Sequence, residues 1–100
     1  MMQPFPQSPE LLRAARRIIW FEEAAVSLAN PLRLMTYALR YATAEDMQLL
    51  LDHVGEDGLR KTLDNIPPGI VDARSWSYWN NRVGRFPAPD MPRRNLDLAR

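Results

Sequence analysis

The clearest pattern in the chain is a set of apolar positions between Thr43 and Gly55 that recur at helical spacing. They follow the i, i+3, i+4, i+7 rule, which places side chains on one face of a helix. These positions are Met47, Leu50, Leu51 and Val54. Thr43 followed by Asp46 resembles a capping box, and Gly55 is a residue type that ends helices in the left-handed conformation. The pattern therefore predicts a helix between Thr43 and Gly55.

A further helix is predicted near the N-terminus, where Ser8 and Pro9 supply a capping hydroxyl and a proline suited to the first helical turn. The apolar positions that follow at helical spacing are Leu11, Ala15 and Ile18. The stretch 18–21 is apolar on every side, and its periodicity does not distinguish a buried helix end from a short extended segment. Both alternatives stay open for this stretch.

The Asn30-Pro31 pair predicts the start of the next helix, because the residue before a proline avoids the helical conformation, asparagine caps helices and proline suits their first turn. This helix is expected to run to about Ala42. Its expected buried side consists of Leu32, Met35, Ala38, Leu39 and Ala42. The opposite side carries Arg33, Thr36, Tyr37 and Arg40.

Two more helices are predicted after Gly55. Asp57 is a candidate N-cap for the first, and the Pro-Pro-Gly stretch 67–69 ends it. The apolar face of this helix is Leu59, Leu63 and Ile66. Asp72 is a candidate N-cap for the second, which is expected to end at Gly84. Its inward side is Trp76, Trp79 and Val83, and the tryptophans at this spacing are expected to be core anchors.

These elements predict an all-α fold. The sequence has no internal repeat and no strand-like alternation, and 100 residues fold around a single core. We expect a small single-domain helical bundle with a helix-turn-helix-like core over residues 1–85. The proline-rich stretch 86–100 is expected to be an extended tail that is too short to pack by itself.

Composition narrows the possible chemistry. Hydrophobic residues make up 46% and charged residues 25% of the chain, as in ordinary globular proteins. The lack of cysteine and the single His53 exclude a disulfide framework, a thiolate metal site and an imidazole cluster, so no cofactor is expected. No phosphate-loop, HExxH or GxSxG motif is present, which argues against an enzyme. Without a membrane-length apolar run or a signal-like start, the protein is expected to be cytoplasmic, with no membrane partner.

The net charge of +1 conceals three segments of different sign. Residues 1–42 carry +2, residues 43–66 carry −4 and residues 67–100 carry +3. Twelve of the thirteen basic residues are arginine, whose planar guanidinium suits phosphate and carboxylate contacts. The arginine bias indicates a binding surface, although a coding preference for arginine explains it equally well.

The order helix, glycine turn, helix, loop, helix is compatible with a helix-turn-helix module, whose later helix enters the major groove of DNA. The side of the last helix opposite its tryptophans carries polar side chains that can contact bases or phosphates. These candidate nucleic-acid-binding residues are Arg74, Tyr78, Asn81 and Arg85, with Arg82 at the edge. A solvated polar face and a protein-contact face are the alternatives for the same residues.

Three stretches carry a family resemblance: IIWFEE at 18–23, RLMTYALRYATAEDMQLLLDHVG at 33–55 and SWSYWNNRVG at 75–84. They resemble the aromatic-acidic entry, the central helix pair and the aromatic C-terminal helix of a family of small bacterial proteins. Members of that family are often encoded beside nucleotidyltransferase toxins of the AbiEii type. The resemblance implies a helical antitoxin that neutralises its toxin by direct binding, and it brings no catalytic residue.

A nucleotidyltransferase site must attract anionic nucleotides, so the acidic segment is the natural complement to such a partner. The candidate partner-binding residues are Glu45, Asp46, Asp52 and Glu56, together with Arg93 and Arg94 of the tail. A further outward surface is the side that carries Arg33, Tyr37 and Arg40. The antitoxin could in addition bind its own operator DNA. The alternative function is a stand-alone, helix-turn-helix-like transcriptional regulator.

Overall fold

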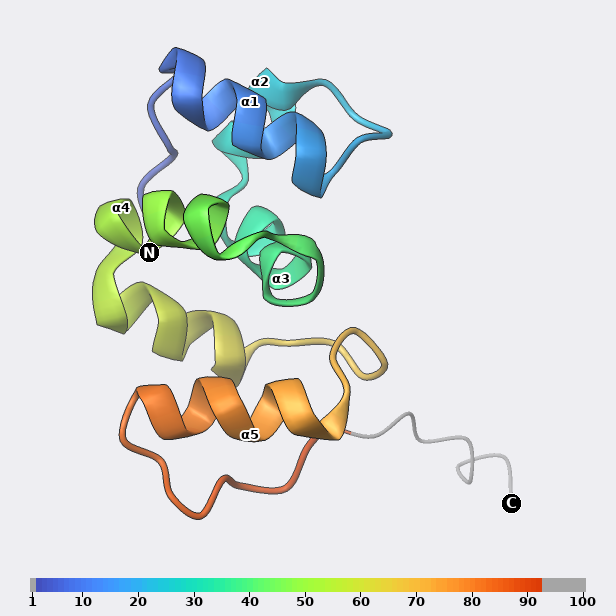
Figure 1. Ribbon diagram of the computed structural model, residues 1–100, viewed down its shortest axis with the longest axis vertical. Coiled ribbons are helices and arrows are strands. Elements are labelled where there is room, and N and C mark those ends of the chain that lie inside the picture. The colour runs from blue at the N-terminus through green and yellow to red at the C-terminus, as the bar shows by residue number, and fades with distance from the viewer. Residues whose placement is uncertain (1, 93–100) are drawn as a thin grey trace.

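The structure is a computed structural model that describes residues 2–92, and within that range it contains five helices and no strand. The all-α prediction is therefore confirmed. The helices are α1 (Pro9–Ile18), α2 (Ala24–Ala29), α3 (Pro31–Tyr41), α4 (Ala44–Asp64) and α5 (Ala73–Arg82). They form three tiers: α1 and α2 at one end, α3 with the first half of α4 in the middle, and the second half of α4 with α5 at the other end (Figure 1).

Three helices begin at the capping residues that the sequence predicts. The Ser8 hydroxyl accepts a hydrogen bond from the Leu11 amide at 3.3 Å, at the start of α1. Thr43 Oγ1 accepts from the Asp46 amide at 3.1 Å, at the start of α4. The third cap, at the start of α5, is the carboxylate of Asp72, which accepts from the Ser75 amide at 2.8 Å. Each of these bonds satisfies an amide that has no partner within its helix.

Asn30 occupies the N-cap position of α3, as predicted, but its side chain makes no capping hydrogen bond to that helix. Its side-chain amide instead donates to the carbonyl of Val26 at the end of α2, at 2.9 Å. The helix α3 begins at Pro31 without a side-chain cap. Proline suits this first position because its own missing N–H would have had no partner within the helix.

The sequence predicts two helices separated by a turn at Gly55. In the structure, Gly55 is a bend within the single element α4. Its backbone lies at φ 70° and ψ −177°, which glycine tolerates and other residues avoid. The predicted break is therefore present, and the two helical halves of α4 meet there at a kink. Asp57 does not act as an N-cap here, since its carboxylate accepts from the Arg60 guanidinium at 3.0 Å. The bend folds the second half of α4 back toward α5 (Figure 1).

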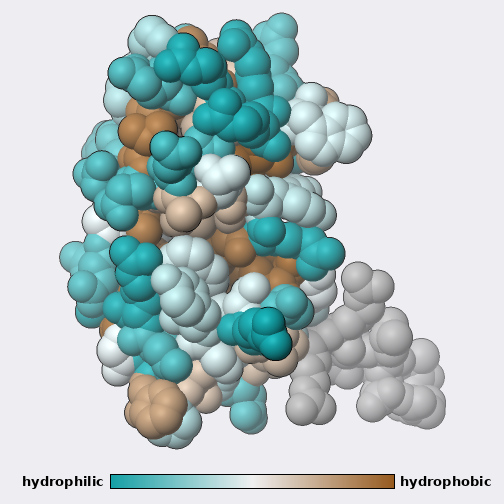
Figure 2. Space-filling model, viewed as in Figure 1, coloured by the Kyte–Doolittle hydropathy of each residue, from teal (hydrophilic) through white to brown (hydrophobic). Residues whose placement is uncertain are grey.

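A single core connects the three tiers. Its fully buried apolar side chains come from α1, α2, α3 and both halves of α4. The largest of these are Ile18, Ile19, Leu28, Leu34, Met35, Leu50, Leu59 and Leu63. On the face shown in Figure 2, hydrophobic residues appear as separate patches between hydrophilic ones. Most of the apolar positions that recur at helical spacing in the sequence are therefore buried in this core.

The buried side of α3 is rotated relative to the prediction. Leu32, predicted to be buried, is exposed, whereas Thr36, predicted to face solvent, is buried. Helix α3 packs against α1 and α2 on one side and against α4 and α5 on the other. Its buried arc is therefore wider than that of a helix with one packed face. The Thr36 hydroxyl remains satisfied because it donates to the Leu32 carbonyl at 2.8 Å.

The segment after α5 packs back onto the domain. The Trp76 side chain is buried, and its indole N–H donates to the Pro89 carbonyl at 2.6 Å. Ala88 and Met91 also pack against the core. Residues 86–92 of the predicted tail are therefore extended, and they pack against the helical domain. Trp79, predicted to be a core anchor like Trp76, is only partly buried.

Candidate protein-binding surfaces

Three of the four predicted acidic contact residues lie exposed on α4. These residues, Glu45, Asp52 and Glu56, are called the acidic face below. Asp52 accepts a hydrogen bond from the side-chain amide of Gln48 at 2.8 Å, and Glu56 forms an ion pair with Arg60 four residues later. The negative charge of the acidic face is thus partly offset toward its Glu56 end.

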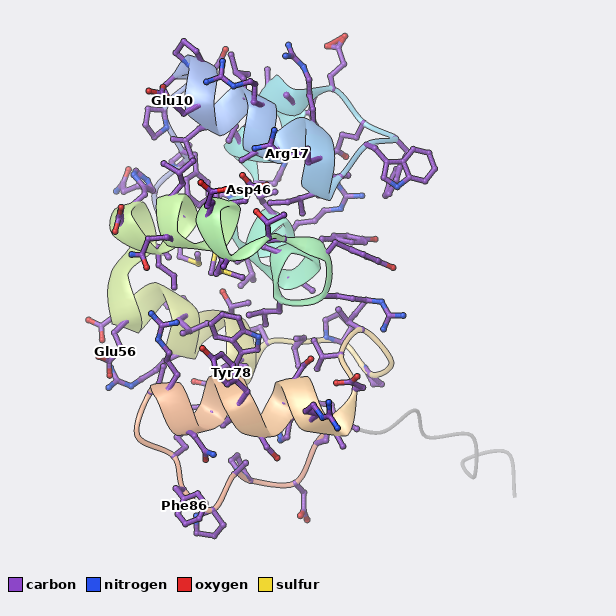
Figure 3. The ribbon with its side chains drawn as sticks, viewed as in Figure 1. Glu10, Arg17, Asp46, Glu56, Tyr78 and Phe86 are labelled. Carbon is purple, nitrogen blue, oxygen red and sulfur yellow. The ribbon has the colours of Figure 1, made fainter. Side chains whose placement is uncertain are left out.

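Asp46, the fourth predicted acidic contact, is not on the surface. Its side chain is only 3% exposed and accepts two hydrogen bonds from Arg17 of α1. The bonds run from Nε to Oδ2 at 2.9 Å and from the terminal guanidinium nitrogen to Oδ1 at 2.6 Å (Figure 3). These hydrogen bonds hold the pKa of Asp46 below its usual range, against the opposing effect of burial. Asp46 therefore ties α1 to α4 and is unavailable for docking.

The predicted nucleic-acid-binding residues divide into two groups. Arg74, Tyr78, Asn81 and Arg82 are exposed on α5. Arg85 lies just beyond α5 and forms an ion pair with Asp64 at 2.8 Å, which joins the ends of α4 and α5. The structure thus leaves four of the five side chains accessible and engages the fifth within the protein. The predicted tail contacts Arg93 and Arg94 lie outside the described residues.

A row of four aromatic rings lies at the edge of the molecule, and of these only Tyr37 belongs to an outward surface that the sequence predicts. Trp20 and Phe21 lie in the loop between α1 and α2, which projects outward from that end of the molecule (Figure 1), and the row continues through Tyr37 and Tyr41 of α3. Consecutive ring centroids are 5.4, 6.0 and 6.4 Å apart. Trp20 is 78% exposed, Phe21 55% and Tyr41 57%. These four residues are called the aromatic strip below.

Charged side chains hold the aromatic strip in place. Glu22 accepts hydrogen bonds from the Ser27 hydroxyl and from the Arg33 guanidinium, and so fixes the loop to α2 and α3. These contacts, led by the Ser27 bond, keep the pKa of Glu22 below its usual range. Arg33 lies 5.3 Å from the centre of the Tyr37 ring, and Arg40 lies 5.4 Å from that of Tyr41. Both distances allow cation–π attraction.

The fold and these surfaces define a small all-α domain whose polar groups lie mainly in helix caps, ion pairs and exposed faces. Searches against protein-family models, curated proteins and solved structures gave no match to this chain. Within residues 2–92, no three acidic or histidine side chains gather in a way that could hold a metal ion. In the same range, no helix has the length and apolar character needed to cross a bilayer.

Proposed function

We propose that this chain is the antitoxin of a bacterial toxin–antitoxin pair and neutralises a nucleotidyltransferase-like toxin by binding to it. The sequence resemblance supports this role. The structural observation that supports it is the acidic face, because Glu45 and Asp52 project from α4 without being used in the core. A surface of this sign complements an enzyme site that attracts nucleotides, and the attraction speeds association.

The proposal also requires a minimum buried area between this chain and the toxin. A stable interface buries roughly 1,200–2,000 Å² in total, or about 800 Å² on each partner. The acidic face alone is too small to provide this area, so neighbouring parts of the domain must contact the toxin as well. Charge on the acidic face is therefore expected to affect the association rate more than the dissociation rate.

Charge reversal on the acidic face is expected to impair neutralisation. The variant Asp52→Lys should associate more slowly with the toxin and rescue the growth of toxin-expressing cells less well than wild type. Asp90→Lys is the matched control, because it makes the same change at an exposed aspartate beyond α5. Reversal of Arg93 and Arg94 should likewise have a smaller effect than reversal of Glu45, Asp52 and Glu56.

Co-expression with the product of the adjacent gene tests the role itself. The toxin should arrest growth alone, be harmless with the wild-type chain and co-purify with it. Failure of the wild-type chain to rescue growth would exclude the antitoxin role. Equal rescue by Asp52→Lys and wild type, with a salt-independent association rate, would exclude the acidic face as the contact surface.

A second candidate function, DNA binding through α5, is favoured by the exposure of Arg74, Tyr78, Asn81 and Arg82 on that helix. Residues four apart on a helix share a side, so Arg74, Tyr78 and Arg82 can meet one groove or backbone together. Arginine and tyrosine contact phosphates, and asparagine reads adenine. This surface would serve either autoregulation by the antitoxin or a stand-alone regulator.

Removal of both arginines on α5 is expected to weaken DNA binding and its salt dependence. For the double variant Arg74→Ala and Arg82→Ala, the slope of log affinity against log salt should fall by up to about 1.8, or about 0.9 for each phosphate that is no longer neutralised. Arg13→Ala with Arg16→Ala on α1 is the matched control, since both arginines are exposed. Fluorescence anisotropy with duplex DNA measures the slope, and no binding by wild type at low salt would rule out this function.

A further inference from the structure

We propose that the aromatic strip is the surface on which a second copy of this chain docks, forming a two-fold symmetric dimer. The proposal is independent of the antitoxin role, because it requires no toxin. It rests on three features of the strip: its exposed area, the order of its rings and the charges at its two ends.

The exposed area of the strip is a substantial part of what an interface needs. Trp20, Phe21 and Tyr41 are each more than half exposed. With 150–250 Å² for a whole aromatic side chain, these three together expose roughly 400 Å². This is about half of the ~800 Å² that each partner contributes to a stable interface. Tryptophan, tyrosine and arginine are also the residue types that dominate binding energy in interfaces.

The strip is ordered before any partner arrives. Each ring contacts the next, and Glu22 ties the loop that carries Trp20 and Phe21 to Arg33 of α3. Because the rings are already held in place, they lose little conformational entropy when they become buried. Binding is stronger when this entropic cost has been met during folding. A strip of this kind favours a partner of matching, fixed shape.

Exposed charged side chains lie at both ends of the strip. Glu23 is exposed at the Trp20 end, where both residues line one shallow hollow with Arg16. The carboxylate of the neighbouring Glu22 is already engaged by Arg33. Arg40 is exposed at the other end, beside Tyr41. The strip therefore has the exposed carboxylate of Glu23, with Arg16 nearby, at one end and the exposed guanidinium of Arg40 at the other.

Such a surface is complementary to itself. A two-fold axis between Phe21 and Tyr37 would bring Trp20 of one copy over Tyr41 of the partner subunit, and the reverse. The same axis would place Glu23 of each copy near Arg40 of the partner subunit, so the charged contact is made twice. Interfaces in which the same patch pairs with itself are the usual basis of symmetric dimers.

The charges favour a second copy over single-stranded nucleic acid. Phosphates would lie close to Glu22 and Glu23 and be repelled by them. Of the two arginines that contact rings of the strip, Arg33 is engaged by Glu22, whereas Arg40 gives only one bond to the Ile70 carbonyl at 3.1 Å and remains exposed at one end. A nucleic-acid groove needs cations that face the backbone along its length.

Sedimentation velocity of the full chain over a concentration series tests the proposal. Wild type should change from 11.6 kDa to twice that mass as concentration rises. Trp20→Ser should weaken dimerisation at least tenfold, because it removes the most exposed ring. Phe86→Ser is the matched control: Phe86 is 81% exposed but lies beyond α5 (Figure 3), and its replacement should leave the dimerisation constant unchanged.

A charge swap tests the arrangement within the dimer. Glu23→Arg should weaken the dimer by placing like charges together, and Arg40→Glu should do the same. Combining the two should restore most of the affinity, with circular dichroism confirming that each variant folds. A wild type that stays monomeric at every concentration would overturn the proposal. A dimer that is insensitive to Trp20→Ser would also overturn it. The same holds if the chain remains monomeric and instead binds oligo(dT) or the toxin in a way that depends on Trp20.

Discussion

Replacing Trp76 with alanine is expected to lower the free energy of unfolding by about 3–5 kcal/mol, the cost of truncating a buried aromatic side chain. Trp76 is 6% exposed and belongs to the core, where α5 packs on α3 and α4. A domain of this size has a total stability of about 5–15 kcal/mol, so a large share would be lost. Urea unfolding followed by circular dichroism measures the change.

Part of this expected loss comes from the segment beyond α5. The Trp76 indole donates to the Pro89 carbonyl, so its removal also releases the chain that covers α5. Trp79→Ala is the comparison variant, because Trp79 is partly buried and lies beneath the Arg82 guanidinium at 5.8 Å. It should cost clearly less than Trp76→Ala. Equal losses for the two variants would show that the tryptophans share one environment, contrary to the structure.

The features that could be predicted from the sequence are those that depend only on residues close together along the chain. An N-cap joins a side chain to an amide three positions later, so Ser8, Thr43 and Asp72 could be recognised directly. The break at Gly55 is equally local, because only glycine readily adopts its backbone angles. Asn30 shows the limit of this reasoning: it lies between two helices, and its side chain donates to Val26 at the end of α2 instead of accepting from an amide of α3.

Features that depend on packing could not be found in the same way. Helix α2 has six residues and no side-chain cap, so neither its periodicity nor its termini stand out. The buried side of α3 is decided by neighbours on two sides, which a search for one apolar stripe does not anticipate. The stretch 18–21 remained undecided because Ile18 and Ile19 point into the core while the next two residues face solvent.

The candidate surfaces show the same division. Asp46 lies four residues before the buried Leu50, so helical spacing alone could have placed it on the inner side of α4. Its partner Arg17 is 29 positions away and could not be identified from spacing. The aromatic strip likewise joins a loop to α3, and only the pair Tyr37 and Tyr41 is visible as an i, i+4 pattern.

The ion pair between Arg17 and Asp46 provides the second large effect. Asp46→Asn is expected to cost about 1.5–3 kcal/mol of stability at neutral pH, the range for hydrogen bonds to charged groups. The change keeps the size of the side chain but removes the charge that receives two bonds from Arg17. Asp52→Asn is the matched control, because it makes the same change at an exposed carboxylate on the same helix and should be nearly neutral.

Because of the ion pair between Arg17 and Asp46, we also expect the protein to lose stability in acid. The Arg17 hydrogen bonds lower the pKa of Asp46 in the folded state, so the unfolded chain binds a proton more readily than the folded one. The contribution of the pair is therefore complete above the usual aspartate pKa of about 3.9 and is lost as the pH falls through the lowered value. Arg17→Gln removes the main cause of the lowered pKa and should flatten this acid dependence, as should Asp46→Asn. Urea unfolding across this pH range tests the assignment: wild type should lose more stability in acid than either variant, and three parallel profiles would show that Asp46 does not cause the loss.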